Sequence, residues 1–390
     1  MKHYNFDEII DRKGTDCVKH DGMAPFFGRG DLSPLWVADM DFRTPDFIMD
    51  AIRERCQHEV LGYAIASDRY YRTMAQWLSN HYHIEAVRKE LHFIPGIVAG
   101  IAFAIQAFTD PGDRILVMNP VYPPFLNLPE GGGRKLSINK LKVADGRFAI
   151  DFDDLDQKAE GSKMLILSNP HNPGGTVWNR EQLKTIAEIC NRHHILVIAD
   201  EIHADLTLPP HQHTSFSTVS EEAKNCSITF IAPSKTFNMA GLGSSIAYTP
   251  NDTIRERFHR YLDSYELANG NIFAFVGAEA AFAHGEEWLR QLKDYLNGNV
   301  KTLQTFLEER MPKVKAILPE ASFLSWLDFS DYGLSHEELH DRLINTCHVA
   351  LNDGTTFGRG DYTCHFRINI GCPRTTLTEA LERIAVGIEN

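Results

Sequence analysis

The chain has 390 residues, of which 43% are hydrophobic and 23% charged, a composition typical of a globular protein with a large core. Its 39 basic residues stand against 52 acidic ones, and the formal charge of -13 argues against a nucleic-acid or anionic-membrane partner. The seven cysteines are scattered and contain no C-x-x-C pair, and the N-terminus lacks the apolar segment of a secretion signal. These features predict a cytoplasmic protein without a disulfide framework.

Helical and strand patterns alternate from about residue 46 to residue 285, after a turn-rich N-terminal segment. Apolar residues at helical spacing predict helices over 46–60, 68–82 and 97–108. Short apolar runs predict strands over 114–118, 164–168, 195–200, 227–232 and 244–249. A helix capped by Asn179 and Gln182 is expected between the second and third of these strands. Strands separated by helices in this way predict a mostly parallel sheet covered on both faces.

The C-terminal quarter has a different pattern. A long helix over 286–311 precedes strands near 314–317, 323–329 and 364–370, with helices starting near 335 and 375. We therefore expect an α/β fold with two domains. The large α/β domain covers residues 46–285, and a smaller α+β domain combines residues 286–390 with the N-terminal segment 1–45.

Three polar residues follow predicted strands of the sheet. Asn172 lies in the turn SNPHNPGG after strand 164–168, Asp200 ends strand 195–200, and Lys235 comes just after strand 227–232. Ligands of open α/β sheets bind at the carboxyl ends of the strands. The sequence therefore predicts that these three side chains meet at one edge of the sheet.

A buried carboxylate and a buried ammonium are both costly unless they are paired. One solution is a direct ion pair between Asp200 and Lys235. The other is a cofactor that uses each group separately, because an aldehyde can take the lysine as an imine and a protonated pyridine nitrogen can pair with the aspartate. Pyridoxal 5'-phosphate (PLP) has both groups.

The order of motifs resembles the fold-type I PLP enzymes, the aspartate-aminotransferase-like superfamily. The motifs are N-P-x-N-P-x-G, then D-E, then S-K-T-F-N-x-A-G-L. Further stretches narrow the resemblance to the MalY/PatB branch, the cystathionine β-lyase-like C–S lyases: SPLWVADMDF (33–42), GYA (62–64), NPVYPPF (119–125), DEIHADL (200–206) and RINIGCPR (367–374). The similarity spans residues 14–390.

The resemblance implies a role for each residue around the cofactor ring. Lys235 would bind the PLP aldehyde and later move the Cα proton of the substrate, and Asp200 would pair with the ring nitrogen. Asn172 would donate to the phenolic oxygen of the ring and lie near the substrate carboxylate. Tyr122 would stack on the ring, the alternative being an ordinary core tyrosine.

The resemblance also implies partners for the two anionic groups. The cofactor phosphate would bind at Gly96, Ile97 and Val98, at the start of a helix, with help from the Ser234 hydroxyl. Tyr63 would reach the phosphate from the second subunit of a homodimer, unless it is only a surface aromatic. Substrate carboxylate would bind the planar guanidinium of Arg367 beside three residues of the N-terminal segment, Trp36, Val37 and Ala38. The alternative for Arg367 is a salt bridge within the small domain.

Three positions depart from the aminotransferase pattern. Many aminotransferases have a serine three residues before the lysine and an arginine eight residues after it, both on the phosphate, whereas this chain has Ala232 and Gly243. The phosphate thus has less cationic support than in a plain aminotransferase. Asp361, in the loop before Arg367, occupies a position where a small residue is expected.

A rival motif, HEELH (336–340), matches the H-E-x-x-H pattern of zinc proteases. Ser335 and Glu338 form a capping box, however, so we interpret the segment as an ordinary helix start and expect no metal.

The resemblance implies a PLP-dependent lyase that performs α,β-elimination on L-cystathionine or a related cysteine thioether, giving a thiol, pyruvate and ammonia. Two alternatives remain open at this point. One is an aminotransferase acting on an L-amino acid and a 2-oxo acid, and the other is a ligand-dependent interaction protein with vestigial catalysis.

Overall fold

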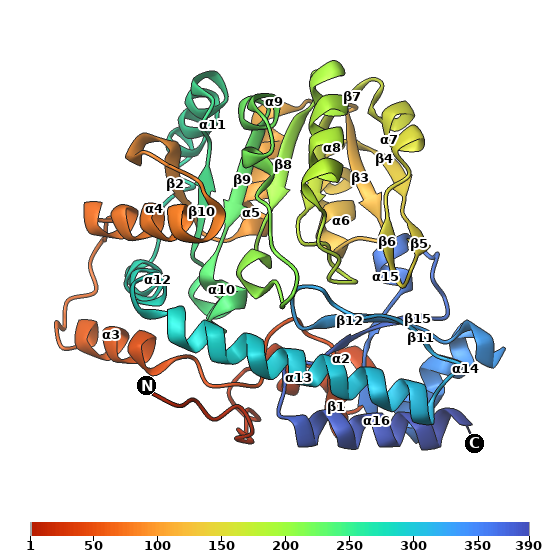
Figure 1. Cartoon of the computed structure of the whole chain (residues 1–390). Helices are drawn as coiled ribbons and strands as arrows, with labels where there is room; N and C mark the ends of the chain where they lie inside the picture. Colours follow the sequence, from red (N-terminus) through yellow and green to blue (C-terminus); the bar gives the residue numbers. More distant parts are fainter. Residues whose placement is uncertain (1, 390) are drawn as a thin grey trace.

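The computed structural model describes residues 2–389 and is built around a seven-stranded sheet (Figure 1). Its strands, in spatial order, are β2 (Leu91–Ile94), β10 (Ser245–Tyr248), β9 (Ser227–Ile231), β8 (Leu196–Asp200), β7 (Ser162–Ser168), β3 (Arg114–Asn119) and β4 (Lys135–Lys140). The five strands from β9 to β4 are parallel, and β10 is antiparallel to both of its neighbours. The predicted mixed, mostly parallel sheet is confirmed, although β2 and β4 were not predicted.

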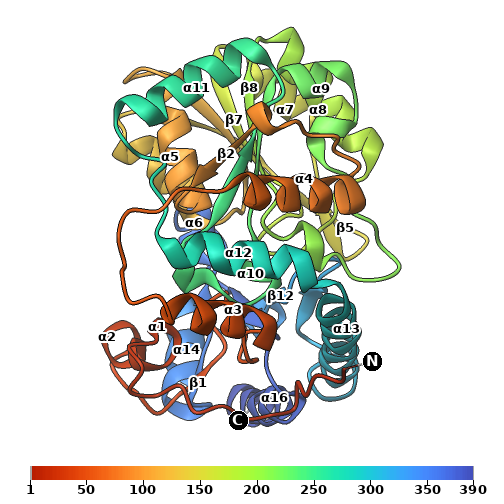
Figure 2. The same ribbon diagram turned by 90° about the vertical axis from the view of Figure 1, so that its left-hand side faces the viewer.

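Helices cover both faces of this sheet (Figure 2). One face packs against α5 (Ile97–Phe108), α6 (Pro123–Gly131) and α11 (Asp252–Ser264). The other face packs against α7 (Phe152–Ala159), α8 (Arg180–Arg192) and α9 (Glu221–Asn225). Alternate residues of one strand serve the two faces: Ile115 and Val117 belong to the first cluster and Leu116 and Met118 to the second. The predicted capping box of Asn179 and Gln182 starts α8.

A second sheet of four antiparallel strands lies beside the first. It contains, in order, β11 (Lys315–Ile317), β12 (Leu324–Asp328), β15 (His365–Asn369) and β14 (Asn352–Asp353). Helices α13 (Glu286–Arg310), α14 (His336–Asp341), α15 (Thr355–Gly358) and α16 (Arg374–Glu389) accompany it. In the N-terminal segment, α1 (Val18–Asp21) and α2 (Met23–Phe27) precede β1 (Ser33–Pro34), which pairs with β13 (Val349–Ala350).

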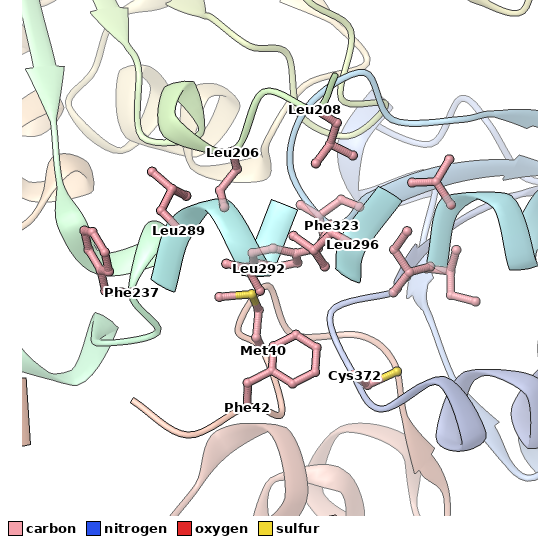
Figure 3. Close-up of a cluster of buried hydrophobic side chains, with 14 of the residues drawn as sticks. Met40, Phe42, Leu206, Leu208, Phe237, Leu289, Leu292, Leu296, Phe323 and Cys372 are labelled. Atoms are coloured by element: carbon pink, nitrogen blue, oxygen red, sulfur yellow. The ribbon is translucent and has the colours of Figure 1, made fainter. Parts of the chain in front are cut away.

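The longest helix, α13, crosses below the large sheet (Figure 1) and packs against both the large-sheet region and the N-terminal segment. Its residues Leu289, Leu292 and Leu296 are buried in a cluster with Leu206 from the large-sheet region and Met40 from the N-terminal segment (Figure 3). Since this cluster is continuous across the molecule, the core does not by itself fix where one domain ends, and the division at residues 46 and 286 stays a prediction.

Two helices connect the N-terminal segment to the large sheet. They are α3 (Asp46–Cys56) and α4 (Asp68–Tyr82), and both pack against α12 (Ile272–His284). Helix α3 ends at Cys56, four residues before the predicted end of the helix over 46–60, and residues 57–67 form an extended connection to α4.

The remaining short elements are β5 (Lys142–Ala144), β6 (Arg147–Ala149), α10 (Pro233–Thr236), η1 (Arg88–Glu90), η2 (Ala204–Leu206), η3 (Phe216–Thr218), η4 (Ala240–Leu242), η5 (Ser330–Tyr332) and η6 (Arg342–Thr346). Within residues 2–389, no helix is both long and apolar enough to span a membrane.

Candidate active site

The sheet topology brings the carboxyl ends of β7, β8 and β9 side by side. Ser168, the last residue of β7, is paired in register with Asp200, the last residue of β8, and Asp200 is paired with Phe230 of β9. Asn172 lies in the turn after β7, and Lys235 lies in α10 directly after β9. The three residues thus follow adjacent strands at one edge of the sheet.

Asp200 is a buried carboxylate with a backbone donor. Its Oδ1 accepts from the Ile202 backbone N–H at 3.0 Å. Burial raises the pKa of Asp200 to about 7, although this hydrogen bond and the charge of Lys235 act in the opposite direction. A cationic partner at this place would hold the carboxylate ionised.

Lys235 does not pair directly with Asp200; its Nζ donates instead to the Ala38 carbonyl at 2.6 Å. Burial lowers the pKa of the Lys235 ammonium to about 8, with Arg367 acting in the same direction and the charges of Asp39 and Asp200 opposing it. The neutral, nucleophilic fraction of this amine near neutral pH is therefore larger than that of an exposed lysine.

Arg367 is a buried guanidinium without an acidic partner. It donates to Asn172 Oδ1 at 3.0 Å, to the Trp36 carbonyl at 3.0 Å and to Asn352 Oδ1 at 2.5 Å. Its Nε has no hydrogen-bond partner among the described residues, and burial lowers its pKa to about 10. The alternative of a salt bridge within the small domain is thus wrong, and the group is suited to bind an anion.

Residues 36–41, here called the 36–41 loop, contribute backbone carbonyls to the site. The Trp36 carbonyl accepts from Arg367 and the Ala38 carbonyl from Lys235, while Asn369 Nδ2 donates to the carbonyls of Val37 and Asp39, each at 2.6 Å. The indole of Trp36 points away, where it packs on Phe26 and Phe27 in the N-terminal segment. Trp36 and Ala38 therefore face the site with main-chain atoms.

Tyr122 and His203 lie among the charged groups. Tyr122 precedes α6, and its pKa is raised mainly by burial, with Arg367 and Asp200 acting on it in opposite directions. His203 is buried, its Nδ1 has no partner among the described residues, and burial with the charges of Lys235 and Arg367 lowers its pKa to about 3. His203 is therefore a neutral imidazole facing the same site.

The N-terminus of α5 lies beside Gly243, eight residues after Lys235. Gly96 caps this helix with φ 142°, a backbone conformation that favours glycine, and the first helical residues are Ile97 and Val98. A Cβ at Gly243 would come within 3.1 Å of the Pro95 carbonyl, and Gly243 has φ 60°. The backbone thus explains why a glycine stands where many aminotransferases have arginine. Ser234, half-buried, directly precedes Lys235.

Tyr63 does not take part in the site of its own chain. It lies in the extended connection between α3 and α4, and its side chain is fully exposed, as are large parts of Val60, Leu61 and Ile65. It borders a surface hollow of about 970 Å³ that also involves residues 262–273.

The remaining motifs have local explanations. Asp361 Oδ2 pairs with Lys140 Nζ at 2.7 Å on the surface, so its side chain points away from Arg367. The HEELH segment forms α14 with the predicted capping box of Ser335 and Glu338, and its His336 pairs with Asp353 at 2.7 Å. No cluster of three or more potential metal ligands occurs among the described residues.

Sequence reasoning missed His203 and Asn352. His203 stands three residues after Asp200, within the first turn beyond β8, and this spacing was a usable signal. Asn352 reaches Arg367 because β14 pairs with β15 with these two residues in register. A strand of two residues leaves no recognisable pattern, so Asn352 could not have been found.

The comparisons with known proteins agree with this geometry. The family model for aminotransferases of class I and II matches residues 34–384. The chain belongs to this family. Over 386 residues it is 41% identical to cystathionine beta-lyase PatB of Bacillus subtilis (strain 168), covering 98% of this chain and 100% of the relative. The resemblance that the motifs indicated is confirmed.

Solved structures of the same fold include C–S lyases. Cystalysin from Treponema denticola, whose structure contains a pyridoxal 5'-phosphate cofactor, superposes with a TM-score of 0.95 at 30% identity, covering 100% of this chain and 99% of that chain. The PLP-bound C-S lyase from Staphylococcus hominis gives a TM-score of 0.92 at 32% identity, with coverage of 100% and 99%. The fold-type I architecture predicted from the sequence is therefore confirmed.

Proposed function

We propose that this protein is a PLP-dependent carbon–sulfur β-lyase that converts L-cystathionine or a related cysteine thioether into a thiol, pyruvate and ammonia. The observation that carries the proposal is a lysine amine of lowered pKa near a buried carboxylate and a buried guanidinium that lacks an anion. The 41% identity to cystathionine beta-lyase PatB over nearly the whole chain supports this choice of reaction. The enzyme is assigned to the cytoplasm on composition.

The residues of the site fit PLP group by group. Lys235 Nζ would attach to the aldehyde carbon, and Asp200 would accept a hydrogen bond from the protonated ring nitrogen, a partner that would keep the buried carboxylate ionised. Asn172, which accepts a hydrogen bond from Arg367, and Tyr122, whose pKa responds to both Arg367 and Asp200, would contact the ring. The backbone N–H groups at Gly96, Ile97 and Val98, with the Ser234 hydroxyl, would bind the phosphate at the start of α5.

Bound PLP supplies an electron sink for the pair of electrons left when the Cα–H bond of the substrate breaks. With PLP bound, Lys235 Nζ would take that proton, as its lowered pKa allows. Loss of the thiolate from the β-carbon and hydrolysis by water would then give pyruvate and ammonia. Asp200 would stay ionised and hold the ring nitrogen protonated.

The substrate carboxylate binds Arg367. The guanidinium already donates from Nη1 to Asn172 Oδ1 and from Nη2 to Asn352 Oδ1 and the Trp36 carbonyl, and Nε, without a partner among the described residues, remains as a donor. Arginine, unlike lysine, can bind a carboxylate with two parallel hydrogen bonds, which fixes the orientation of the Cα–H bond.

The working unit is a homodimer in which Tyr63 contributes to the phosphate site of the neighbouring subunit. Tyr63 is fully exposed in its own chain, within a run that leaves Val60, Leu61 and Ile65 more than half exposed. Several large apolar side chains exposed on one extended segment are unusual on a monomer and mark an interface.

The experiment that tests the function is incubation of the purified protein with PLP and L-cystathionine, with and without a 2-oxo acid. Pyruvate and thiol in equal amounts without an acceptor are expected. Membership of the aminotransferase class I and II family favours transamination as the second candidate. Formation of a new amino acid only when the 2-oxo acid is present would establish that candidate and reject the lyase.

A further inference from the structure

Another buried carboxylate, Asp205, lies in η2, one short turn beyond Asp200. Its Oδ1 accepts hydrogen bonds from Trp77 Nε1 at 3.0 Å and from the Tyr82 hydroxyl, and its Oδ2 accepts from Thr236 Oγ1 at 2.9 Å. All three donors are neutral. The pKa of Lys293 in α13 is lowered by burial, and the negative charge of Asp205 partly opposes this effect.

The hydrogen bonds of Asp205 join three elements around the active site. Trp77 and Tyr82 lie near the end of α4, whereas Thr236 directly follows Lys235 in α10. The bond to Thr236 therefore connects the turn that carries Lys235 to the loop that follows Asp200.

Packing against α13 holds η2 in place without the hydrogen bond to Thr236. Leu206, the neighbour of Asp205, is fully buried and lies beside Leu289 and Leu292 of α13 (Figure 3). Helix α10 has four residues, of which Pro233 and Thr236 are buried and Ser234 and Lys235 are partly exposed, and the fully buried Phe237 follows it. Thr236 is the residue of α10 that bonds to Asp205 of η2, so this hydrogen bond acts at the end of α10 next to Lys235.

We propose that Asp205 is a positioning residue that, through Thr236, fixes the orientation of α10 and so the place of Lys235 Nζ opposite Asp200. The inference rests on the proposed role of Lys235. A misplacement of about 1 Å at a reacting group can lower a rate by about 100-fold, so even a slight rotation of α10 matters to proton transfer. The alternative is that Asp205 only braces the fold.

Two matched variants separate these possibilities. Thr236→Val and Tyr82→Phe each remove one hydroxyl that donates to the same carboxylate, but only Thr236 adjoins Lys235. The first measurement needs no activity: Lys235 of the cofactor-free, full-length chain is labelled with trace acetic anhydride across a pH series and quantified by mass spectrometry. The second measurement is the rate of pyruvate formation by the PLP-loaded protein.

Loosening α10 lets water reach Nζ, so in Thr236→Val the midpoint of labelling shifts upward from near pH 8 toward the ordinary lysine value. The turnover number falls by about tenfold or more, because Nζ is no longer held in place. Thr236→Ser restores both properties, and Tyr82→Phe keeps the wild-type midpoint even where it lowers the melting temperature.

Equal shifts in Thr236→Val and Tyr82→Phe, or an unchanged midpoint in Thr236→Val, would overturn the inference and leave Asp205 a structural brace. If Thr236→Val does not fold, Thr236→Ala takes its place beside Tyr82→Phe in the same labelling assay, under the same criteria. A wild-type protein that forms no pyruvate would reject the lyase proposal, yet the labelling result would still decide the role of Asp205.

Discussion

At the scale of single residues, the site is defined by charged groups whose burial is not compensated within the chain. Asp200 has a raised pKa, Lys235 and Arg367 have lowered ones, and burial is the largest cause for each of the three. Burying such groups without an ion-pair partner is costly, and strongly shifted pKa values of this kind concentrate at sites that bind a ligand. A cofactor with an aldehyde and a basic ring nitrogen, and a substrate with a carboxylate, would complete all three.

The first prediction at this scale concerns Asp200→Asn. The variant should keep PLP bound through Lys235 and the phosphate contacts, while turnover falls. Loss of a charge-assisted hydrogen bond costs about 1.5–3 kcal/mol, which corresponds to a rate lower by about tenfold to more than a hundredfold. Absorbance spectra check cofactor content and pyruvate release checks the rate. A variant with wild-type turnover would show that Asp200 does not support the electron sink.

Arg367→Lys separates substrate binding from cofactor binding. The charge is kept but the planar fork is lost, so KM for cystathionine should rise by about tenfold or more while PLP content is unchanged. Steady-state kinetics of the PLP-saturated variant measure the effect. Unchanged KM, or loss of PLP with KM retained, would contradict a role on the substrate carboxylate.

At the scale of elements, the site is made by three turns that follow β7, β8 and β9. These strands were predictable because each is a continuous apolar run, as expected for strands buried on both faces. The edge strand β4 was not, because it buries polar residues: Ser137 donates to the Lys158 carbonyl and Asn139 to Asp154. The contact of Asn352 depends on tertiary structure and leaves no local pattern, whereas His203 could have been found from its spacing to Asp200.

A buried histidine in the turn after β7 predicts that the folded state loses stability as the pH falls. His171 is buried there with Nε2 at 2.8 Å from the Pro120 carbonyl, and burial lowers its pKa to about 4. The folded state thus keeps His171 neutral, whereas the unfolded chain binds a proton below about pH 6.5, so this group destabilises the fold as pH falls from 6.5 to 4. Between pH 7 and pH 5 the contribution is about 2 kcal/mol.

The measurement is the free energy of unfolding at pH 7 and pH 5 for the wild type and for His171→Gln at equal cofactor content. The wild type should lose more stability on acidification than the variant does. The comparison between variants is needed because Asp200, with its raised pKa, acts in the opposite direction over this range. Parallel losses in the two proteins would show that His171 does not stay neutral in the fold.

At the scale of the whole molecule, the extended connection 57–67 exposes large apolar side chains that no other part of the single chain, over residues 2–389, covers. It follows α3 and leads into α4, and its exposed residues Leu61, Tyr63 and Ile65 border the surface hollow beside residues 262–273. A second copy of the chain would cover this apolar segment and bring Tyr63 to the neighbouring phosphate site.

Mixing two inactive variants tests this arrangement. Tyr63→Phe should loosen PLP and leave the Arg367 site intact, and Lys235→Ala should abolish turnover. A mixed dimer places both lesions in one site and leaves the other site whole, so partial activity should return after subunit exchange. No recovery despite verified exchange would show that Tyr63 serves its own subunit or only packs there. If Tyr63→Phe alone stays active, its PLP retention is compared with the wild type, and equal retention contradicts the phosphate contact.

The central claim is that Lys235 carries the cofactor and moves the Cα proton in a β-elimination. The most direct test is pyruvate formation from L-cystathionine by PLP-loaded wild type and Lys235→Ala, combined with borohydride reduction and mass spectrometry of the wild type. We predict that the wild type releases pyruvate and thiol in equal amounts and carries the reduced cofactor on Lys235, and that the variant does neither. Full turnover by Lys235→Ala, or the reduced cofactor on a different lysine, would contradict the claim.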